Sequence, residues 1–453
     1  MIAPPISIWT LLPEIILVVS GCVVLLLGQS QRGETRRWAP WATLGALVLA
    51  LLATLFESRL GQLLGGPSTV GNGLAYGPLA DFVRKSALQL GIVLTLVNWS
   101  EARDSERGEF LALMLFSLTG LLLVGAADNL VVLFLAIELV SFPTYIMIVL
   151  SRTNAASLEA GTKYFYLGAM SAALMAYGFS FLYGVAGTAA LGTATDRVVA
   201  ALRQPGTLGC GLATVGVVLA LGGLLFKIAA VPLHFYVADV YQGASSPVAG
   251  LLGFVPKLGG FVAIFKIVLL TGYWNGVGTA AFWLLWLVAV ASMCVGNMLA
   301  LRQTNIKRML GYSGIAHSGY MLVGVLAGPL AGKSGTGEGG GVFGVFGDGT
   351  AGVLYYIVVY GIANLGAFAV LGVLRVRDEP CETLRDVAGL LRRHPAPALL
   401  LVLAMFTLMG LPPTPGFWGK TMLFGSALTG ARVFAAGPRD TNCLPDASVA
   451  RKL

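Results

Sequence analysis

Residues 212–236 read LATVGVVLALGGLLFKIAAVPLHFY, an apolar run that contains Lys227 and, five positions later, Pro232. A run of this length can cross the ~30 Å hydrocarbon core of a bilayer as a helix. Because proline has no amide hydrogen, Pro232 removes the bond to the carbonyl of Ile228 and weakens the turn next to the lysine. The stretch therefore predicts a broken membrane helix with a lysine at the break.

The whole chain has the composition of a membrane protein. Of its 453 residues, 57% are hydrophobic and only 11% are charged, and the mean hydropathy is +0.82; soluble domains carry roughly 25% charged residues. The net charge of +8 comes from Lys and Arg in short loops, without the basic, aromatic face of a nucleic-acid-binding surface. Five scattered cysteines form no C-x-x-C pair, which argues against a metal centre, an iron–sulfur cluster or a disulfide framework.

Twelve apolar segments predict an all-α polytopic membrane protein. They lie near 10–28, 39–56, 79–98, 108–127, 129–150, 160–185, 212–238, 247–271, 279–300, 305–328, 350–375 and 397–428. Lys and Arg gather in the loops after spans one, three, five, nine and eleven, so the positive-inside rule places these loops in the cytoplasm and the N-terminus outside. The first span begins with Pro13 and Glu14 instead of a basic stretch, and it is expected to be retained as a helix.

A second break is expected near the C-terminal end of the apolar region. The sequence GLPPTPGFWGK at 410–420 places three prolines ahead of Lys420. The two breaks are five spans apart, which suggests a repeat of five helices, and because five is odd the two units would be inverted. The expected organisation is a three-helix segment at 1–107, a first repeat at 108–275, a second, incomplete repeat at 276–430 and a polar tail at 431–453.

Ionisable side chains within the spans are the candidate functional residues, since a Lys or carboxylate at mid-bilayer costs at least ~2.5 kcal/mol on insertion scales. The candidates are Glu138, Lys163, Lys227, His234, Lys257, His317 and Lys420. Moving a carboxylate relative to a desolvated lysine changes whether that lysine holds its proton, and water at helix breaks can carry the proton between side chains. These residue types therefore indicate proton transfer through the membrane.

Structural roles remain open for several of these side chains. Glu138 could form a buried ion pair with no part in transport, and His234 and His317 could be hydrogen-bonded packing residues. Lys266 is expected to extend its ammonium toward the membrane interface. Arg84 and its charged neighbours are expected to mark an interfacial boundary.

Six motifs carry a family resemblance. They are ELVSFP at 138–143, EAGTKYF at 159–165, FKIAAVPLHFY at 226–236, the run at 247–257, NIKRMLGYSGIAHSGY at 305–320 and the motif at 410–420. Together they resemble the antiporter-like membrane subunits of proton-pumping NADH:quinone oxidoreductase, respiratory complex I, over roughly residues 10 to 425. Within that family the chain is most similar to subunit N, because its last span carries a lysine and no long lateral helix follows.

The resemblance implies that the candidates form one chain of proton-carrying groups along the membrane midplane. The implied roles are modulating carboxylate for Glu138, central lysine for Lys227, partner near these two for Lys163, lateral relay for Lys257, exit-side lysine for Lys420 and lining of the water path for His234 and His317. Such a subunit of the bacterial inner membrane holds no redox centre. Flavin and iron–sulfur clusters are expected in partner subunits, and quinone is the substrate of the complex.

The chain departs from this family in one respect. Subunits of the family have fourteen spans, whereas this sequence turns polar after about Gly430. The last two spans are therefore expected to be absent, as in a truncated, frameshifted or mispredicted form, which puts the exit path through Lys420 in question.

Two rival functions follow from the same residues. A subunit of a multi-chain cation/proton antiporter would share the motifs and would show sodium-dependent transport. A non-transporting scaffold subunit would tolerate neutralisation of Glu138 or Lys227. A stand-alone enzyme is the weakest reading, because the sequence has no nucleophile elbow, metal-ligand cluster or phosphate loop.

Overall fold

The computed structural model describes residues 8–30, 33–64, 73–99, 107–151, 155–272, 279–328, 348–376 and 379–435. Within these ranges the regular secondary structure is helical, apart from a short antiparallel pair formed by β1 (Arg375–Val376) and β2 (Glu379–Pro380). The predicted all-α architecture is confirmed. The polar tail predicted from 431 falls almost entirely outside the described residues.

The helices outnumber the predicted spans: each predicted span contains at least one of them, the last contains two, and most of the short ones lie outside the spans. They are η1 (Ile8–Leu11), α1 (Leu12–Gly28), α2 (Gly33–Arg36), α3 (Ala39–Leu64), α4 (Pro78–Val97), α5 (Arg107–Ala126), α6 (Leu130–Ser151), α7 (Ala155–Ala186), α8 (Leu191–Leu202), α9 (Leu208–Lys227), α10 (Val237–Gly243), α11 (Ser246–Leu269), α12 (Thr279–Leu301), α13 (Ile306–Ala327), α14 (Gly349–Val373), α15 (Leu390–Arg393), α16 (Pro395–Met409) and α17 (Pro415–Ala435). Eight of the described helices are long and apolar enough to cross a bilayer, and α1 and α16 are shorter apolar helices.

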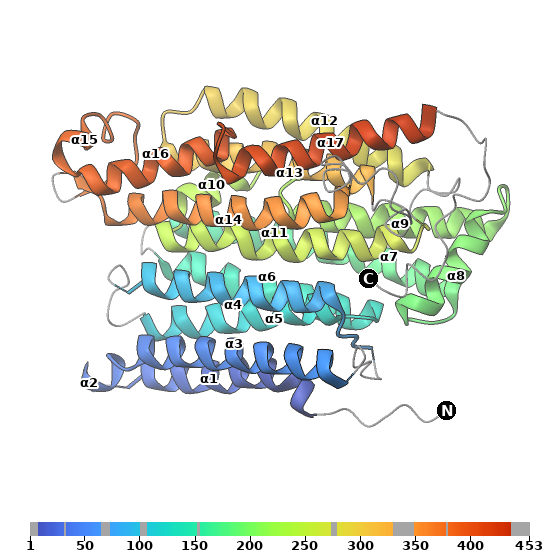
Figure 1. The fold of residues 1–453 in the computed structure, drawn as a ribbon, viewed down its shortest axis with the longest axis horizontal. Helices are drawn as coiled ribbons and strands as arrows, with labels where there is room; N and C mark the ends of the chain where they lie inside the picture. Colours follow the sequence, from blue (N-terminus) through green and yellow to red (C-terminus); the bar gives the residue numbers. More distant parts are fainter. Residues whose placement is uncertain are drawn as a thin grey trace.

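Most of these helices lie side by side in a stacked bundle (Figure 1). The N-terminal helices α1 and α3 form one edge, with α5 and α4 packed against them, whereas α12 and α17 lie at the opposite edge. Helix α11 occupies the middle, in contact with α5, α6, α9, α13 and α14, and every residue from Ser246 to Val268 is buried. The central position of α11 follows from its sequence, which has no polar face.

Helix α8, a 12-residue helix in a segment that the sequence left between two spans, was missed. It presents Leu191, Ala194, Val198 and Leu202 to the protein, at the spacing of one helical face. The helix covers one end of α7 and α9 (Figure 1). It is too short to cross a bilayer, and its amphipathic pattern resembles a surface helix of a soluble domain.

A buried charge cluster joins the three N-terminal helices. The Arg84 guanidinium donates to both carboxylate oxygens of Glu14, at 2.7 and 2.8 Å, and to Glu57 at 3.0 Å. It also donates to the carbonyl of Thr10 and lies 3.9 Å from the ring centroid of Tyr76. Arg84 is only 3% exposed, so it fixes helix ends to one another and does more than mark a boundary.

Lys266 also differs from its expected place. Its ammonium is buried and donates to the carbonyls of Gly125 and Ala127, at the C-terminal end of α5, instead of extending to the interface. A cation at this position stabilises the negative end of the α5 dipole. The prediction for Lys266 was wrong because carbonyl acceptors 141 and 139 residues away in the sequence leave no local signal.

Candidate functional site

The predicted break at Pro232 is present. Helix α9 ends at Lys227, α10 begins at Val237, and the residues between them are not α-helical. Ala229 has φ +59°, in the left-handed region that a helix does not use. The broken segment therefore places Lys227 at the last turn of a half-helix inside the protein.

Neighbouring helices satisfy the backbone groups that the break releases. The carbonyl of Ile228 accepts a hydrogen bond from Ser318 of α13 at 2.6 Å, and the amide of Val231 donates to Ser292 of α12 at 3.0 Å. The Tyr236 hydroxyl donates to the carbonyl of Phe226 at 2.8 Å. Irregular backbone within a membrane protein requires such partners, because the bilayer core offers no water.

Lys227 and Glu138 form an ion pair at this break. The Lys227 ammonium lies 2.9 Å from Glu138 Oε1 and 2.9 Å from the hydroxyl of Ser141, one turn farther along α6. The lysine side chain is 2% exposed and the glutamate 26%. Exposed Leu135 and Phe142 flank the carboxylate, so Glu138 lies on the outer face of the subunit while its partner is enclosed.

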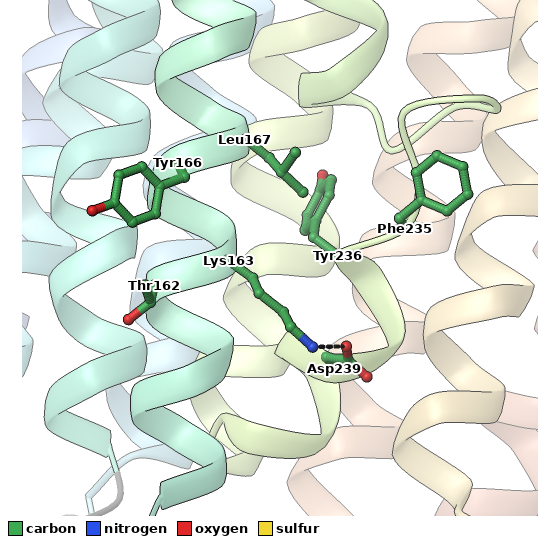
Figure 2. Close-up of a pocket in the computed structure, with 7 residues that line it drawn as sticks. All are labelled: Thr162, Lys163, Tyr166, Leu167, Phe235, Tyr236 and Asp239. Atoms are coloured by element: carbon green, nitrogen blue, oxygen red, sulfur yellow. Dashed lines mark hydrogen bonds and ion pairs between the residues drawn. The ribbon is translucent and has the colours of Figure 1, made fainter.

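Lys163 belongs to a second ionic cluster. Its ammonium lies 2.8 Å from Asp239 and 2.7 Å from Glu159, and Asp239 also accepts from Arg308 at 2.9 Å. Figure 2 shows the Lys163 side chain directed from α7 toward Asp239 on α10. Lys163 is therefore paired with Glu159 of its own helix and with Asp239 of α10, and among the described residues it forms no ion pair with Glu138.

A pocket opens beside this second cluster, with a volume of about 500 Å³. Its lining residues are Thr162, Lys163, Tyr166, Leu167, Phe235, Tyr236 and Asp239 (Figure 2). The ring of Tyr236 faces the pocket, stacks on Tyr164 at 5.0 Å between centroids and contacts the tilted ring of Phe226 at 4.4 Å. Because Phe226 precedes Lys227, the aromatic stack connects the pocket with the buried ion pair.

Lys257 lies at the centre of α11, which continues through Pro256 without a break. Its ammonium is buried and donates to the carbonyl of Gly314 in α13. The hydroxyl of Ser318 lies 3.0 Å from the same carbonyl and also reaches Ile228. Ser318 thus lies between the broken end of α9 and the acceptor of Lys257.

His317, three residues after Gly314, is surrounded by tyrosines. Its Nδ1 lies 2.7 Å from the hydroxyl of Tyr356, and its ring centroid lies 5.0 Å from that of Tyr360 and 5.5 Å from that of Tyr320. His234, in contrast, has a buried Nδ1 without a partner among the described residues. The path-lining role predicted for His234 therefore has no contact to support it and stays a prediction.

The second predicted break lies between α16 and α17. Lys420 of α17 donates to the carbonyls of Leu408 and Met409 at 2.9 and 2.8 Å, at the C-terminal end of α16. Its ammonium also lies 5.2 Å from the ring centroid of Tyr320, which contacts His317. The cation therefore caps one half-helix and lies close to the aromatic surroundings of the histidine.

Sequence reasoning missed the hydroxyl groups that join these cations. Ser292 and Ser318 carry no charge, and their importance depends on a break in another helix. Tyr356, Tyr360 and Asn364 were detectable, since they recur every fourth residue in an otherwise apolar span. The described residues contain no group of three or more His, Cys, Asp or Glu side chains that could hold a metal ion.

Comparison with known proteins agrees with the motif resemblance. The family described as NADH:quinone oxidoreductase/Mrp antiporter, TM, matches residues 127–437. The NADH-quinone oxidoreductase subunit N of Trichlorobacter lovleyi is 34% identical over 95% of this chain and 83% of its own length, and that of Granulibacter bethesdensis is 36% identical over 93% and 82%.

Solved structures give the same result. A chain of respiratory complex I from Thermus thermophilus is 31% identical and superposes with a TM-score of 0.71 over 92% of this chain and 83% of its own. A chain of the Mrp complex from Dietzia shares the fold, with a TM-score of 0.76 at 20% identity over 95% of this chain and 76% of its own. The chain therefore belongs to the NADH:quinone oxidoreductase/Mrp antiporter transmembrane family.

Proposed function

We propose that this chain is a proton-translocating membrane subunit of an NADH:quinone oxidoreductase, driven by quinone reduction in neighbouring subunits. The observation that carries the proposal is the ion pair between Lys227 and Glu138 at the end of a broken helix. A paired, enclosed lysine is the group needed to hold a proton within a membrane. The names of the relatives and the complex I fold support the assignment.

The proposed proton path begins at the pocket beside Lys163 and Asp239. It passes the Tyr164 and Tyr236 stack to Lys227, continues by way of Ser318 to Lys257, and ends through His317 near Lys420. The carbonyl of Gly314 supports the central step, since both Ser318 and Lys257 reach it. Water completes the path at the two helix breaks, where backbone and hydroxyl groups offer hydrogen-bond partners.

The switch in this proposal is the distance between Glu138 and Lys227. While the carboxylate stays at 2.9 Å, the buried ammonium is neutralised and its charge is tolerated. If Glu138 moves outward, the unpaired ammonium lies in a medium of low dielectric constant and passes its proton to the next acceptor. Glu138 is the mobile partner because its side chain reaches the subunit surface and Lys227 does not.

The surface around Glu138 is the proposed contact with the adjacent membrane subunit. Val131, Leu135, Phe142 and Ile146 are exposed on the same face of α6 as the carboxylate. A carboxylate on an apolar, membrane-facing surface requires a cationic or hydrogen-bonding partner. A neighbouring subunit that presents such a group would set the position of Glu138 and so couple the two chains.

We further propose the organisation on which this path depends. The chain crosses the bacterial inner membrane twelve times with its N-terminus outside, and it consists of a three-helix segment at 1–107 and inverted repeats at 108–275 and 276–430. The similar breaks after α9 and α16, each with a lysine at a half-helix end, support the repeats. The chain itself carries no redox centre, and flavin, iron–sulfur clusters and quinone belong to partner subunits.

Proton pumping in membrane vesicles energised with NADH tests the proposal. Lys227→Ala is compared with the native chain at equal assembly, which native electrophoresis measures. Lys85→Ala is the matched control, because among the described residues Lys85 pairs only with Asp81 of its own helix α4. Loss of pumping in Lys227→Ala alone supports the proposal. Unchanged pumping in an assembled complex contradicts it and favours the scaffold function.

A cation/proton antiporter subunit is the second candidate, favoured by the shared fold with the Dietzia Mrp chain. It predicts that pumping through this chain requires sodium. The same vesicles in sodium-free and sodium-containing buffer separate the two candidates, since proton translocation by the oxidoreductase subunit is expected to be equal in both.

A further inference from the structure

Helix α14 carries a polar stripe through the interior of the protein. Tyr356, Tyr360 and Asn364 are one turn apart on one face, and each is at most 2% exposed. The stripe faces α11 and α13, the helices that hold Lys257 and His317. Three polar side chains at this spacing in an apolar core need hydrogen-bond partners, and the stripe has too few.

Tyr360 packs between the two ionisable side chains. Its ring centroid lies 4.9 Å from the Lys257 ammonium and 5.0 Å from the ring centroid of His317. The ring therefore contacts both the lysine and the imidazole. No other described aromatic side chain contacts both groups.

The Tyr360 hydroxyl also lies close to the lysine. A Cβ atom on Gly314 would lie 2.7 Å from this hydroxyl and 2.9 Å from the Lys257 ammonium. The two groups therefore approach the same point, and a side chain at position 314 would displace both. Glycine at this position keeps the space between the hydroxyl and the ammonium open.

Two polar atoms of the stripe have no hydrogen-bond partner among the described residues. They are the hydroxyl oxygen of Tyr360 and the amide nitrogen of Asn364, and both are buried. Buried donors without protein partners are the usual sites of internal water molecules. Water is the ligand that fits here, because a phenol can accept one hydrogen bond and donate another.

The third member of the stripe, Tyr356, fixes the imidazole. Its hydroxyl bonds to His317 Nδ1 at 2.7 Å, which leaves Nε2 for any other exchange. When the ring is protonated both nitrogens are donors, so Tyr356 must then accept from Nδ1. The imidazole is thereby held in one orientation beside Tyr360.

We propose that the Tyr360 hydroxyl relays protons between Lys257 and His317, through water bound between the hydroxyl and the lysine. This inference rests on the proposed function and adds a residue to it. The Lys257 ammonium gives a proton to the water, the water gives one of its protons to the phenol oxygen, and the phenol gives its original proton to His317 Nε2. The water and the phenol have then each gained and lost one proton and are unchanged. Lys257 is now neutral, and His317 carries the positive charge.

Tyr360→Phe is the direct test, because it keeps the ring and removes only the hydroxyl. The variant is assembled in the complete complex, and NADH-driven proton pumping is measured in vesicles in H₂O and D₂O. Tyr355→Phe is the matched control. Tyr355 precedes Tyr356 on α14 but lies outside the stripe, and its side chain is 37% exposed. We expect Tyr360→Phe to lower pumping severalfold and to change the solvent isotope effect, with Tyr355→Phe equal to the native chain.

Two further variants separate failure of the relay from failure of the proposed function. Gly314→Ala fills the space between the hydroxyl and the ammonium and is expected to reproduce Tyr360→Phe. Lys257→Gln removes the proton carrier itself. If Lys257→Gln abolishes pumping while Tyr360→Phe pumps like Tyr355→Phe, the relay is wrong and the proposed function stands. If Lys257→Gln pumps normally, the proposed path through this chain is wrong.

Discussion

The hydroxyl of Ser318 lies 2.6 Å from the carbonyl oxygen of Ile228, and this contact joins α13 to the broken end of α9. The two residues are 90 positions apart in the chain, in the two proposed repeats. With Ser292, which accepts from the amide of Val231, Ser318 provides the polar groups that an unbroken helix would have supplied. The second half of the chain therefore stabilises the irregular backbone of the first.

Ser318→Ala is expected to destabilise the protein, since the buried carbonyl of Ile228 loses its side-chain donor. The expected loss is about 1–3 kcal/mol, the usual cost of an unpaired buried polar group. Thermal unfolding of the purified complex measures it. Ser426→Ala is the control, because Ser426 is also buried but, within the described part of the chain, bonds only to Leu423 of its own helix. Equal shifts in the two variants would contradict the bridging role.

The ion pair between Glu138 and Lys227 allows stability and proton pumping to be separated by mutation. Glu138→Gln or Lys227→Met alone leaves one member of the pair without its partner. Loss of one partner of a fully buried pair lowers the free energy of unfolding by about 3–5 kcal/mol. The loss is expected to be smaller here, because Glu138 is partly exposed. The double variant removes both charges and is expected to regain part of that stability without regaining proton pumping. Unfolding temperature and pumping rate of all three variants check this. A double variant that pumps would contradict the role of the pair.

A variant of Asp239 tests whether the pocket is the entry of the proposed proton path. Asp239→Asn removes the charge that Lys163 and Arg308 share, so two cations beside the pocket lose their common carboxylate and the approach of a proton to the pocket becomes less favourable. We expect slower pumping that recovers in part at high ionic strength, where charges near the surface are screened. Glu109→Gln, a carboxylate at the start of α5 outside the path, is the control. Equal salt dependence in both variants would rule out the electrostatic explanation.

Variants of Arg84 are expected to change the stability of the protein through the buried charge cluster. Arg84→Met leaves Glu14 and Glu57 without their shared cation, and we expect a loss of about 3–5 kcal/mol in stability. Arg84→Lys retains the charge but not the forked geometry, so an intermediate loss is expected. Lys85→Met, which breaks only the partly exposed pair with Asp81, is expected to cost less than about 0.5 kcal/mol. Thermal unfolding of the three variants gives the order.

The long apolar helices and the two breaks were predictable from the sequence, because each depends on residues close together in the chain; the short helix α8 was not. Length and hydropathy locate α9 and α11, and Pro232 locates the break after Lys227. Contacts between distant residues were not predictable in this way. From the sequence alone, Glu14 indicated only that the first helix is not a cleaved signal peptide. Its hydrogen bond to Arg84 depends on packing between residues 70 positions apart.

The candidate site was predicted as a set of ionisable residues, and the structure divides that set into groups. Lys227 and Glu138 do pair, and Lys420 does lie beside a break. Lys163 pairs instead with Asp239, and Lys257 reaches a backbone carbonyl, which no sequence pattern encodes. Neutral groups such as Ser318 and Tyr360 become important only because of what surrounds them.

The enclosure of α11 has a consequence for how the protein is made. Helices leave the insertion machinery in chain order, so α11 enters the membrane before α13 and α14 exist to cover it. Until they arrive, Lys257 has neither the carbonyl of Gly314 nor the ring of Tyr360 beside it and faces lipid or an insertion factor. Synthesis that stops before residue 306 would therefore leave a charged helix exposed in the bilayer, a signal that membrane quality control can recognise.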